Sequence, residues 1–182
     1  MLRGLVLIVF LIGQVSACNV QNVDPGNLWK VVKSKDAGFK ASFPCDAVST
    51  KKLFQEVPKL AHLYSFECEY EGINFSVSLP ERFGEFDPIQ VGQDLDGVEE
   101  TLLSMIGKNA RIISTNRIFQ SYSLREFEVD SGETFGRQIH IVHPRGVYGV
   151  QVFGKYATNA GRSRIDNLAH KFLDSFTFLE GR

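Results

Sequence analysis

Cysteine is scarce in this chain, which has only three in 182 residues. That number is too small for a disulfide scaffold and for a structural zinc site built on thiolates. No charge of one sign dominates either, since 20 basic residues face 21 acidic ones. A positive excess is the electrostatic mark of nucleic-acid binding. We therefore expect no nucleic-acid partner.

The motifs of common catalytic and phosphate-binding sites are also missing. The sequence contains no G-x-S-x-G, no H-E-x-x-H and no G-x-x-x-x-G-K-[ST]. Residues 94–97 (DLDG) are similar to the middle of an EF-hand loop, but Gly92 and Leu103 stand at its first and twelfth ligand positions. His140 and His143 lie three apart on an expected strand, so they would point to opposite faces. We expect no catalytic residue, no metal site and no cofactor.

The chain has ample material for a hydrophobic core. Hydrophobic residues make up 43% of the sequence, and 15 residues are phenylalanine. This length and composition suit one globular domain, which we place at residues 28–182. The polar residues before it, with Pro25-Gly26, are typical of a tether.

Residues 1–17 have the pattern of a secretory signal peptide. Arg3 is the only charge before Asp24, and an apolar run of eight, residues 5–12, is followed by small residues. That run is far shorter than the ~20 residues that span a bilayer. Residues 15–18 (VSAC) resemble the bacterial lipobox. The resemblance implies cleavage before Cys18, a diacylglyceryl group on its sulfur and an acyl chain on its new amino group.

Residues 18–27 would then be the lipidated cysteine and its tether, because several acyl chains together give a stable anchor. Asn19 follows the cysteine, and no aspartate stands there to signal retention in the inner membrane. By resemblance, the protein would be lipid-anchored in the bacterial cell envelope, at the outer membrane facing the periplasm. The alternative is an ordinary signal peptide cut nearby, with Cys18 a spare thiol.

Export would leave Cys45 and Cys68 in an oxidising compartment, where two remaining cysteines are usually paired. Cys45 continues the apolar alternation of residues 39–43, and Cys68 falls on the apolar positions of residues 64–70. Both side chains are thus expected on the core side of their strands. We expect them to form a disulfide, and two buried free thiols are the alternative.

The hydrophobic pattern predicts an α+β domain in which an antiparallel β-sheet is flanked by helices. Apolar residues at helical spacing predict helices over 91–106 and 165–176. Short turns between most strands require antiparallel pairing. Strands are expected at residues 29–34, 39–45, 64–70, 73–79, 111–120, 124–130, 135–142, 147–154 and 176–179.

Two short segments carry a resemblance to a known superfamily. Residues 36–44 (DAGFKASFP) resemble the opening hairpin of the PsbP/Mog1-like superfamily. Residues 171–178 (KFLDSFTF) resemble its closing helix and strand. The resemblance implies an α/β/α sandwich that serves in binding and assembly rather than in catalysis.

One local charge feature remains near the C-terminus. Lys155, Arg162, Arg164 and Lys171 lie on or just before the last expected helix, and acidic residues crowd the stretch 81–100. The two groups could form ends of opposite sign that steer a charged partner. Ordinary solvated helix faces are the alternative.

Taken together, these features predict a lipid-anchored envelope lipoprotein. It would be a non-catalytic binding or assembly module for an envelope protein or a ligand, held at the membrane through Cys18. The alternatives are a hydrolytic enzyme with an unconventional site and a purely structural component of the envelope.

Overall fold

The computed structural model describes residues 29–53, 60–82, 95 and 110–179. Its strands are β1 (Lys30–Ser34), β2 (Phe39–Phe43), β3 (Val48–Leu53), β4 (Leu60–Tyr70), β5 (Ile73–Arg82), β6 (Arg111–Phe119), β7 (Tyr122–Asp130), β8 (Thr134–His143), β9 (Gly146–Lys155) and β10 (Thr177–Phe178). Helix α2 spans Asn159–Ser175.

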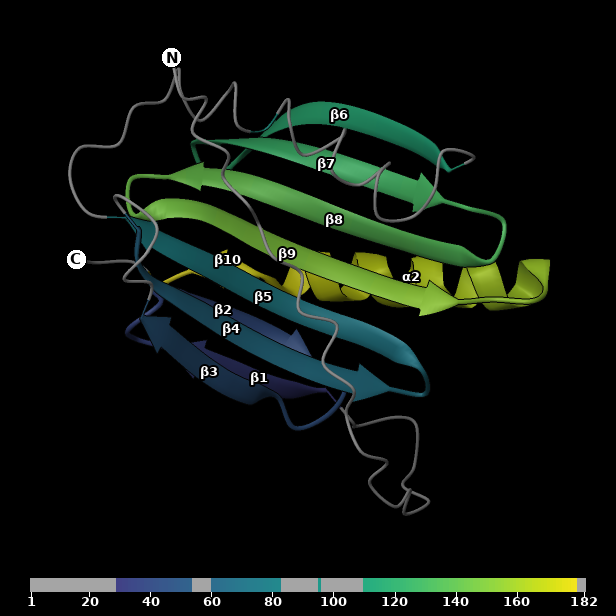
Figure 1. The fold of residues 1–182 in the computed structure, drawn as a ribbon, viewed down its shortest axis with the longest axis horizontal. Helices are drawn as coiled ribbons and strands as arrows, with labels where there is room; N and C mark the ends of the chain where they lie inside the picture. Colours follow the sequence, from purple (N-terminus) through teal and green to yellow (C-terminus); the bar gives the residue numbers. More distant parts are fainter. Residues whose placement is uncertain (1–28, 54–59, 83–94, 96–109, 180–182) are drawn as a thin grey trace.

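The strands form two antiparallel sheets. The large sheet has seven strands in the order β3-β4-β5-β9-β8-β7-β6, and the small sheet has three in the order β1-β2-β10. Helix α2 and the small sheet lie together behind the large sheet in the view of Figure 1. They cover one of its faces, which we call the helix side. The other face carries a second buried cluster, in which Leu95 packs with Phe127, Val129 and Val147, and we call it the Leu95 side.

Alternation of apolar and polar residues explains why these segments are strands. In β5, Ile73, Phe75, Val77 and Leu79 are each no more than 3% exposed and point to the helix side. In β2 the two phenylalanines and Ala41 are fully buried, while the residues between them are half-buried. The alternate apolar side chains of both strands therefore face the common core.

Helix α2 begins at a side-chain cap, because Thr158 Oγ1 accepts a hydrogen bond from the Gly161 amide at 3.1 Å. Its buried residues are Ile165, Ala169, Phe172 and Leu173. Gly154 lets the helix lie close to β9, since a Cβ there would be 3.1 Å from Cδ1 of Ile165. Helix and sheet are thus in direct contact at a position without a side chain.

Aromatic rings join the layers of the core. Phe172 on α2 lies edge-on to Phe43 of the small sheet at 4.9 Å between ring centroids and to Phe75 of the large sheet at 5.4 Å. Trp29, just before β1, contacts Phe75 at 6.0 Å. One helix residue therefore packs against both sheets, which makes the three elements one core.

The structure bears out the strand and antiparallel predictions and corrects others. Strand β3 was not expected, because VSTKKL carries two lysines and no apolar alternation; it pairs with β4 at the sheet edge. The strands form two sheets rather than one, since β1, β2 and β10 pair only among themselves in the described residues. Helix α2 begins six residues before Ile165, in a polar first turn that the apolar pattern cannot reveal.

The predicted helix over 91–106 lies outside the described residues, except for Leu95, which is helical and 6% exposed. The described part of the fold is therefore mainly antiparallel sheet, with α2 on one face and the helical Leu95 packed against Phe127, Val129 and Val147 on the other. The boundaries expected at residues 17 and 27 also lie outside it. Within the described residues, no helix has the length and hydropathy needed to cross a membrane.

Candidate interaction surface

A network of ion pairs joins β7, β8 and α2 on the helix side. Arg137 lies at its centre, and its side chain is only 15% exposed. Its guanidinium donates to Glu126 at 3.0 Å, to Glu128 at 2.7 Å and to Asp166 of α2 at 2.5 Å. Burial lowers the pKa of Arg137, but the hydrogen bond and charge of Asp166 outweigh it, so the pKa is raised.

Arg162 extends the same network along α2. Its guanidinium donates to Asp130 at 2.6 Å and to Glu128 at 3.1 Å, and lies 4.1 Å from the centroid of the Phe135 ring. The Tyr156 hydroxyl donates to Asp130 at 2.6 Å. Burial of Asp130 raises its pKa, but hydrogen bonds from Tyr156 and Arg162 outweigh burial and lower it. The two guanidinium groups are therefore shared among four carboxylates and hold the helix on the sheet.

The four basic residues singled out in the sequence point to different parts of the molecule. Arg162 pairs with β7, Arg164 forms an ion pair with Glu71 in the turn between β4 and β5, and the Lys171 ammonium lies 4.4 Å from the ring centroid of Trp29. Lys155 is exposed at the end of β9. The acidic stretch 81–100 lies almost entirely outside the described residues, so the steering role stays a prediction.

The structure links Cys45 and Cys68 in a disulfide, with 6.0 Å between their Cα atoms. Cys68 is 7% exposed on the helix side of β4, and Cys45 follows β2. The bond therefore connects the small sheet to the large one, as the parity of the two strands suggested. Cys18 lies outside the described residues.

Strand β6 is the far edge of the large sheet, and most of its side chains are exposed (Figure 1). Among the described residues it pairs with β7 only. Ile118 is 74% exposed and Ile113 is 39% exposed, although both are large apolar residues. Solvent-exposed apolar side chains along a regular sheet edge are a common place for another chain to dock.

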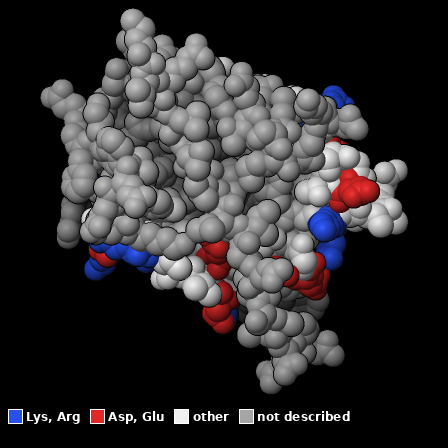
Figure 2. Space-filling model, in the orientation of Figure 1, with Lys and Arg blue, Asp and Glu red and all other residues white. Residues whose placement is uncertain are grey.

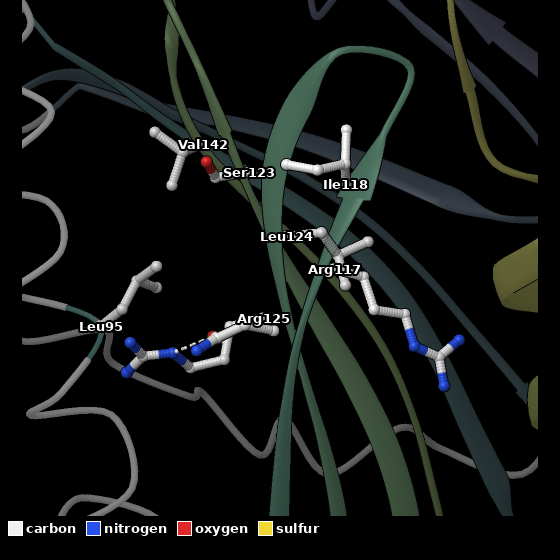
Figure 3. Close-up of a pocket in the computed structure, with 8 residues that line it drawn as sticks. Leu95, Arg117, Ile118, Ser123, Leu124, Arg125 and Val142 are labelled. Carbon is white, nitrogen blue, oxygen red and sulfur yellow. Dashed lines mark hydrogen bonds between the residues drawn. The ribbon is translucent and has the colours of Figure 1, made fainter.

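A cavity of ≈ 420 Å³ lies beside this edge on the Leu95 side. Its lining includes Leu95, Asn116, Ile118, Ser123, Arg125 and Val142. Figure 3 shows Leu95 and Arg125 on one side of the β6–β7 ribbon, while Arg117 points away from the other side. The Arg125 Nε donates to the Asn116 Oδ1 at 3.0 Å, which fixes these two polar groups at the cavity wall.

Two histidines of β8 lie near these surfaces and face opposite sides, as their spacing predicts. The ring centroid of His143 lies 4.6 Å from that of Phe178 on the helix side, and His140 contacts Phe127 on the Leu95 side. His140 is 2% exposed, and burial, assisted by the charge of Arg125, lowers its pKa to about 4. No described residue lies within hydrogen-bond distance of its Nδ1.

Among the described residues that are visible in Figure 2, charged side chains of one sign do not gather into a patch. In Figure 2 the described lysines, arginines, aspartates and glutamates show along the rim, with both signs interspersed. Within the described residues, no three histidine, cysteine, aspartate or glutamate side chains converge as a metal site would require. The β6 edge and its cavity are therefore the features on which a function can be argued.

The sequence reading missed this edge, although the sequence carries a signal for it. Residues 111–119 (RIISTNRIF) are rich in β-branched residues and lack the clean alternation of a half-buried strand. The ion-pair network was missed as well. Alternating acidic residues at 126, 128 and 130 mark one face of β7, but nothing local reveals that Arg137 and Arg162 meet them there.

Comparison with known proteins bears on the fold. No family model matches the chain, and no curated protein matches it in sequence. The solution structure of cyanobacterial PsbP (CyanoP) from Synechocystis sp. PCC 6803 is similar, with a TM-score of 0.52 over 91% of this chain and 99% of that chain. The fold is PsbP-like. At 12% sequence identity, this likeness establishes the fold alone.

Proposed function

We propose that this protein is a lipid-anchored, non-catalytic binding module of the bacterial cell envelope, and that it docks a partner protein at the β6 edge. The observation that carries the proposal is the exposure of Ile118 beside the cavity at Asn116, together with that of Ile113 on the opposite face of the same strand. Large apolar side chains left in water at a sheet edge favour association, because a partner would remove them from solvent.

The ion pairs of Arg137 and Arg162 also favour a binding role over a catalytic one. Arg137 and Arg162 donate hydrogen bonds to four carboxylates and so stabilise the packing of α2. Groups engaged in this way serve to hold the scaffold rigid. A rigid scaffold with an exposed edge is the arrangement expected of an assembly module, which the PsbP-like fold supports.

The proposed anchor would leave the β6 edge accessible. The described chain enters at Trp29, which packs on Phe75 of β5. In the large sheet β6 lies four strand positions from β5, which corresponds to roughly 19 Å at ~4.8 Å per strand. A membrane anchor attached ahead of Trp29 and a partner seated on β6 would thus occupy separate parts of the domain.

Site-specific photo-crosslinking tests the docking role. A photo-reactive amino acid replaces Ile118 in the anchored protein, and a matched variant carries it at Val48, which is 67% exposed on the opposite edge. Irradiation of intact membranes is expected to give one discrete adduct from position 118 and none from position 48. Equal labelling from both positions, or no adduct from 118, would refute docking at β6.

Labelled palmitate tests the anchor separately. We expect the chain to incorporate the label and a Cys18→Ala variant to lose it. Absence of label from the natural chain, or label that survives the substitution, would refute lipidation at Cys18.

A further inference from the structure

We infer that β6 receives its partner as an added β-strand, an extended peptide segment whose side chains alternate between carboxylates and apolar groups. This inference rests on the proposed docking role of the β6 edge and names the chemistry of the occupant. Strand addition takes its affinity from main-chain hydrogen bonds and its specificity from alternate side chains.

The main chain of β6 is regular enough to act as a template. It pairs with β7 without a bulge, from Arg111 opposite Asp130 to Phe119 opposite Tyr122. Among the described residues its other side has no strand partner, and the side chains from Ile113 to Ile118 are all exposed. An edge strand of this kind presents a row of N–H and C=O groups to an incoming chain.

The opposite edge of the sheet lacks these properties. Strand β3 has six residues against nine in β6, and it includes Lys51 and Lys52. Adjacent lysines on an edge strand are a common device against pairing. Strand β6 contains neither lysine nor proline, so it is the better template of the two.

Charge on the helix side of β6 selects carboxylates. Arg111 and Arg117 are an even number of residues apart, so both point to this side. Arg117 already pairs with Glu126 at 3.0 Å, yet its side chain is 62% exposed and can accept a second carboxylate. Opposite charges on neighbouring strands stabilise a sheet, so acidic residues at alternate positions of the added strand would meet these two arginines.

The same charges argue against a second copy of this chain as the occupant. Strand β6 has two arginines and no acidic residue. A β6–β6 pair would bring two further arginines to this edge, where Glu126 of β7 is already shared by Arg117 and Arg137. Like charges directly opposite each other on adjacent strands destabilise pairing. The occupant is therefore a different, acidic segment.

The Leu95 side of β6 selects apolar side chains. Ile112 and Ile118 point there, and Ile118 forms part of the cavity wall together with Val142 and Leu95. Positions of the added strand on this side would cover the exposed Ile118 and reach the cavity mouth. Alternation of the two faces then gives the partner pattern: carboxylate toward the arginines, apolar group toward Ile118.

The test uses the full chain and a blocked, fluorescent peptide in which glutamate and leucine alternate. Fluorescence anisotropy measures binding, and hydrogen exchange with mass spectrometry locates it. We expect saturable binding and slower exchange confined to β6. A peptide with lysine in place of glutamate should bind at least ten-fold more weakly. Replacing Arg111→Gln with Arg117→Gln should weaken the glutamate peptide about three- to ten-fold, while Lys33→Gln with Lys35→Gln should not.

Backbone methylation separates strand addition from docking by side chains alone. Two further peptides carry N-methyl groups at all odd or at all even positions. Since only alternate N–H groups of an added strand face β6, one peptide should lose binding and the other should retain most of it. Equal behaviour of the two, or exchange protection away from β6, would overturn the inference.

The outcomes also distinguish this inference from the proposed function. A crosslinked partner at position 118 without peptide binding would retain the docking role and refute strand addition by an acidic segment. Peptide binding without any membrane adduct would retain the strand chemistry and refute the proposed function. Sedimentation that shows a dimer abolished by Ile118→Glu, with no peptide binding, would assign the edge to a second copy and overturn the inference.

Discussion

Asp166 on α2 accepts a hydrogen bond from Arg137 on β8, with 2.5 Å between Oδ1 and Nε. This contact ties the helix to a sheet strand 29 residues away in sequence. The same guanidinium also meets Glu126 and Glu128 of β7, so one side chain fixes two strands and the helix at once. Arg137 therefore contributes to the packing of α2 on the β7–β8 part of the sheet.

Replacing Arg137→Met should therefore destabilise the protein. The change leaves Asp166 partly buried without its guanidinium partner and leaves Glu126 with Arg117 alone. This loss costs about 2 kcal/mol once the remaining solvent exposure is taken into account. Urea unfolding followed by circular dichroism measures the loss. The matched variant Lys155→Met removes an exposed cation at the end of β9 and should change the free energy of unfolding by less than about 0.5 kcal/mol. Equal effects of the two variants would contradict the structural role of the network.

Much of the fold could be predicted from local pattern, because the spacing of apolar residues differs between strands and helices. The alternation at Phe39, Ala41 and Phe43 marked β2, and Ile165 with Phe172 marked the buried face of α2. The separation into two sheets could not be predicted in this way. It depends on which strands pair at long range, and alternation carries no information about the partner.

The interaction surface was harder to predict for a different physical reason. Strand β6 differs from the core strands because most of its side chains are exposed on both faces. Exposure is a property of the assembled sheet order, in which β6 comes last. The destination of Arg162 likewise depends on β7 lying beneath α2, so the sequence could show its charge but not its partner.

The disulfide gives a second stability prediction. Cys45 and Cys68 are 23 residues apart, and closing a loop of this length stabilises the fold by about 3 kcal/mol in the chain-entropy model. Cys45→Ser should lower the free energy of unfolding by about that amount. Reduction of the natural chain should give a similar loss and should have no effect on the variant. A thiol count on the unfolded, unreduced protein provides the check, because free Cys45 and Cys68 would contradict the bond.

Two glycines should respond in opposite ways to alanine. A Cβ at Gly136 on β8 would lie 2.6 Å from the Val152 carbonyl oxygen and would meet the Phe153 ring, so Gly136→Ala should cost about 1–3 kcal/mol. At Gly161 in α2 the nearest atoms are 3.5 Å away, and Gly161→Ala should be neutral or stabilise by up to about 1 kcal/mol. Thermal unfolding of both variants tests the pair. A Gly136→Ala protein as stable as the natural chain would show that Phe153 does not cover β8 as described.

Stability should also fall as the pH drops from 7 to 5, because His140 is buried in its neutral form. Burial first, and the charge of Arg125 second, lower the pKa of His140 to about 4, against 6.5 as its ordinary value. Between these values the unfolded chain binds a proton that the folded protein does not, so the free energy of unfolding falls with falling pH. The expected loss from this residue is about 2 kcal/mol between pH 7 and pH 5.

Urea unfolding at several pH values isolates this contribution. His140→Leu should remove most of the slope in this window, whatever its effect on stability at pH 7, because leucine takes up no proton. His143 also has a lowered pKa, from burial and from Arg145, so His143→Asn should remove only a smaller part of the slope. Asp130 does not contribute here, since its lowered pKa means that its stabilisation is lost only below its ordinary value of 3.8. A slope unchanged in His140→Leu would mean that His140 takes up its proton in the folded protein as readily as in water, and would contradict its burial beside Phe127.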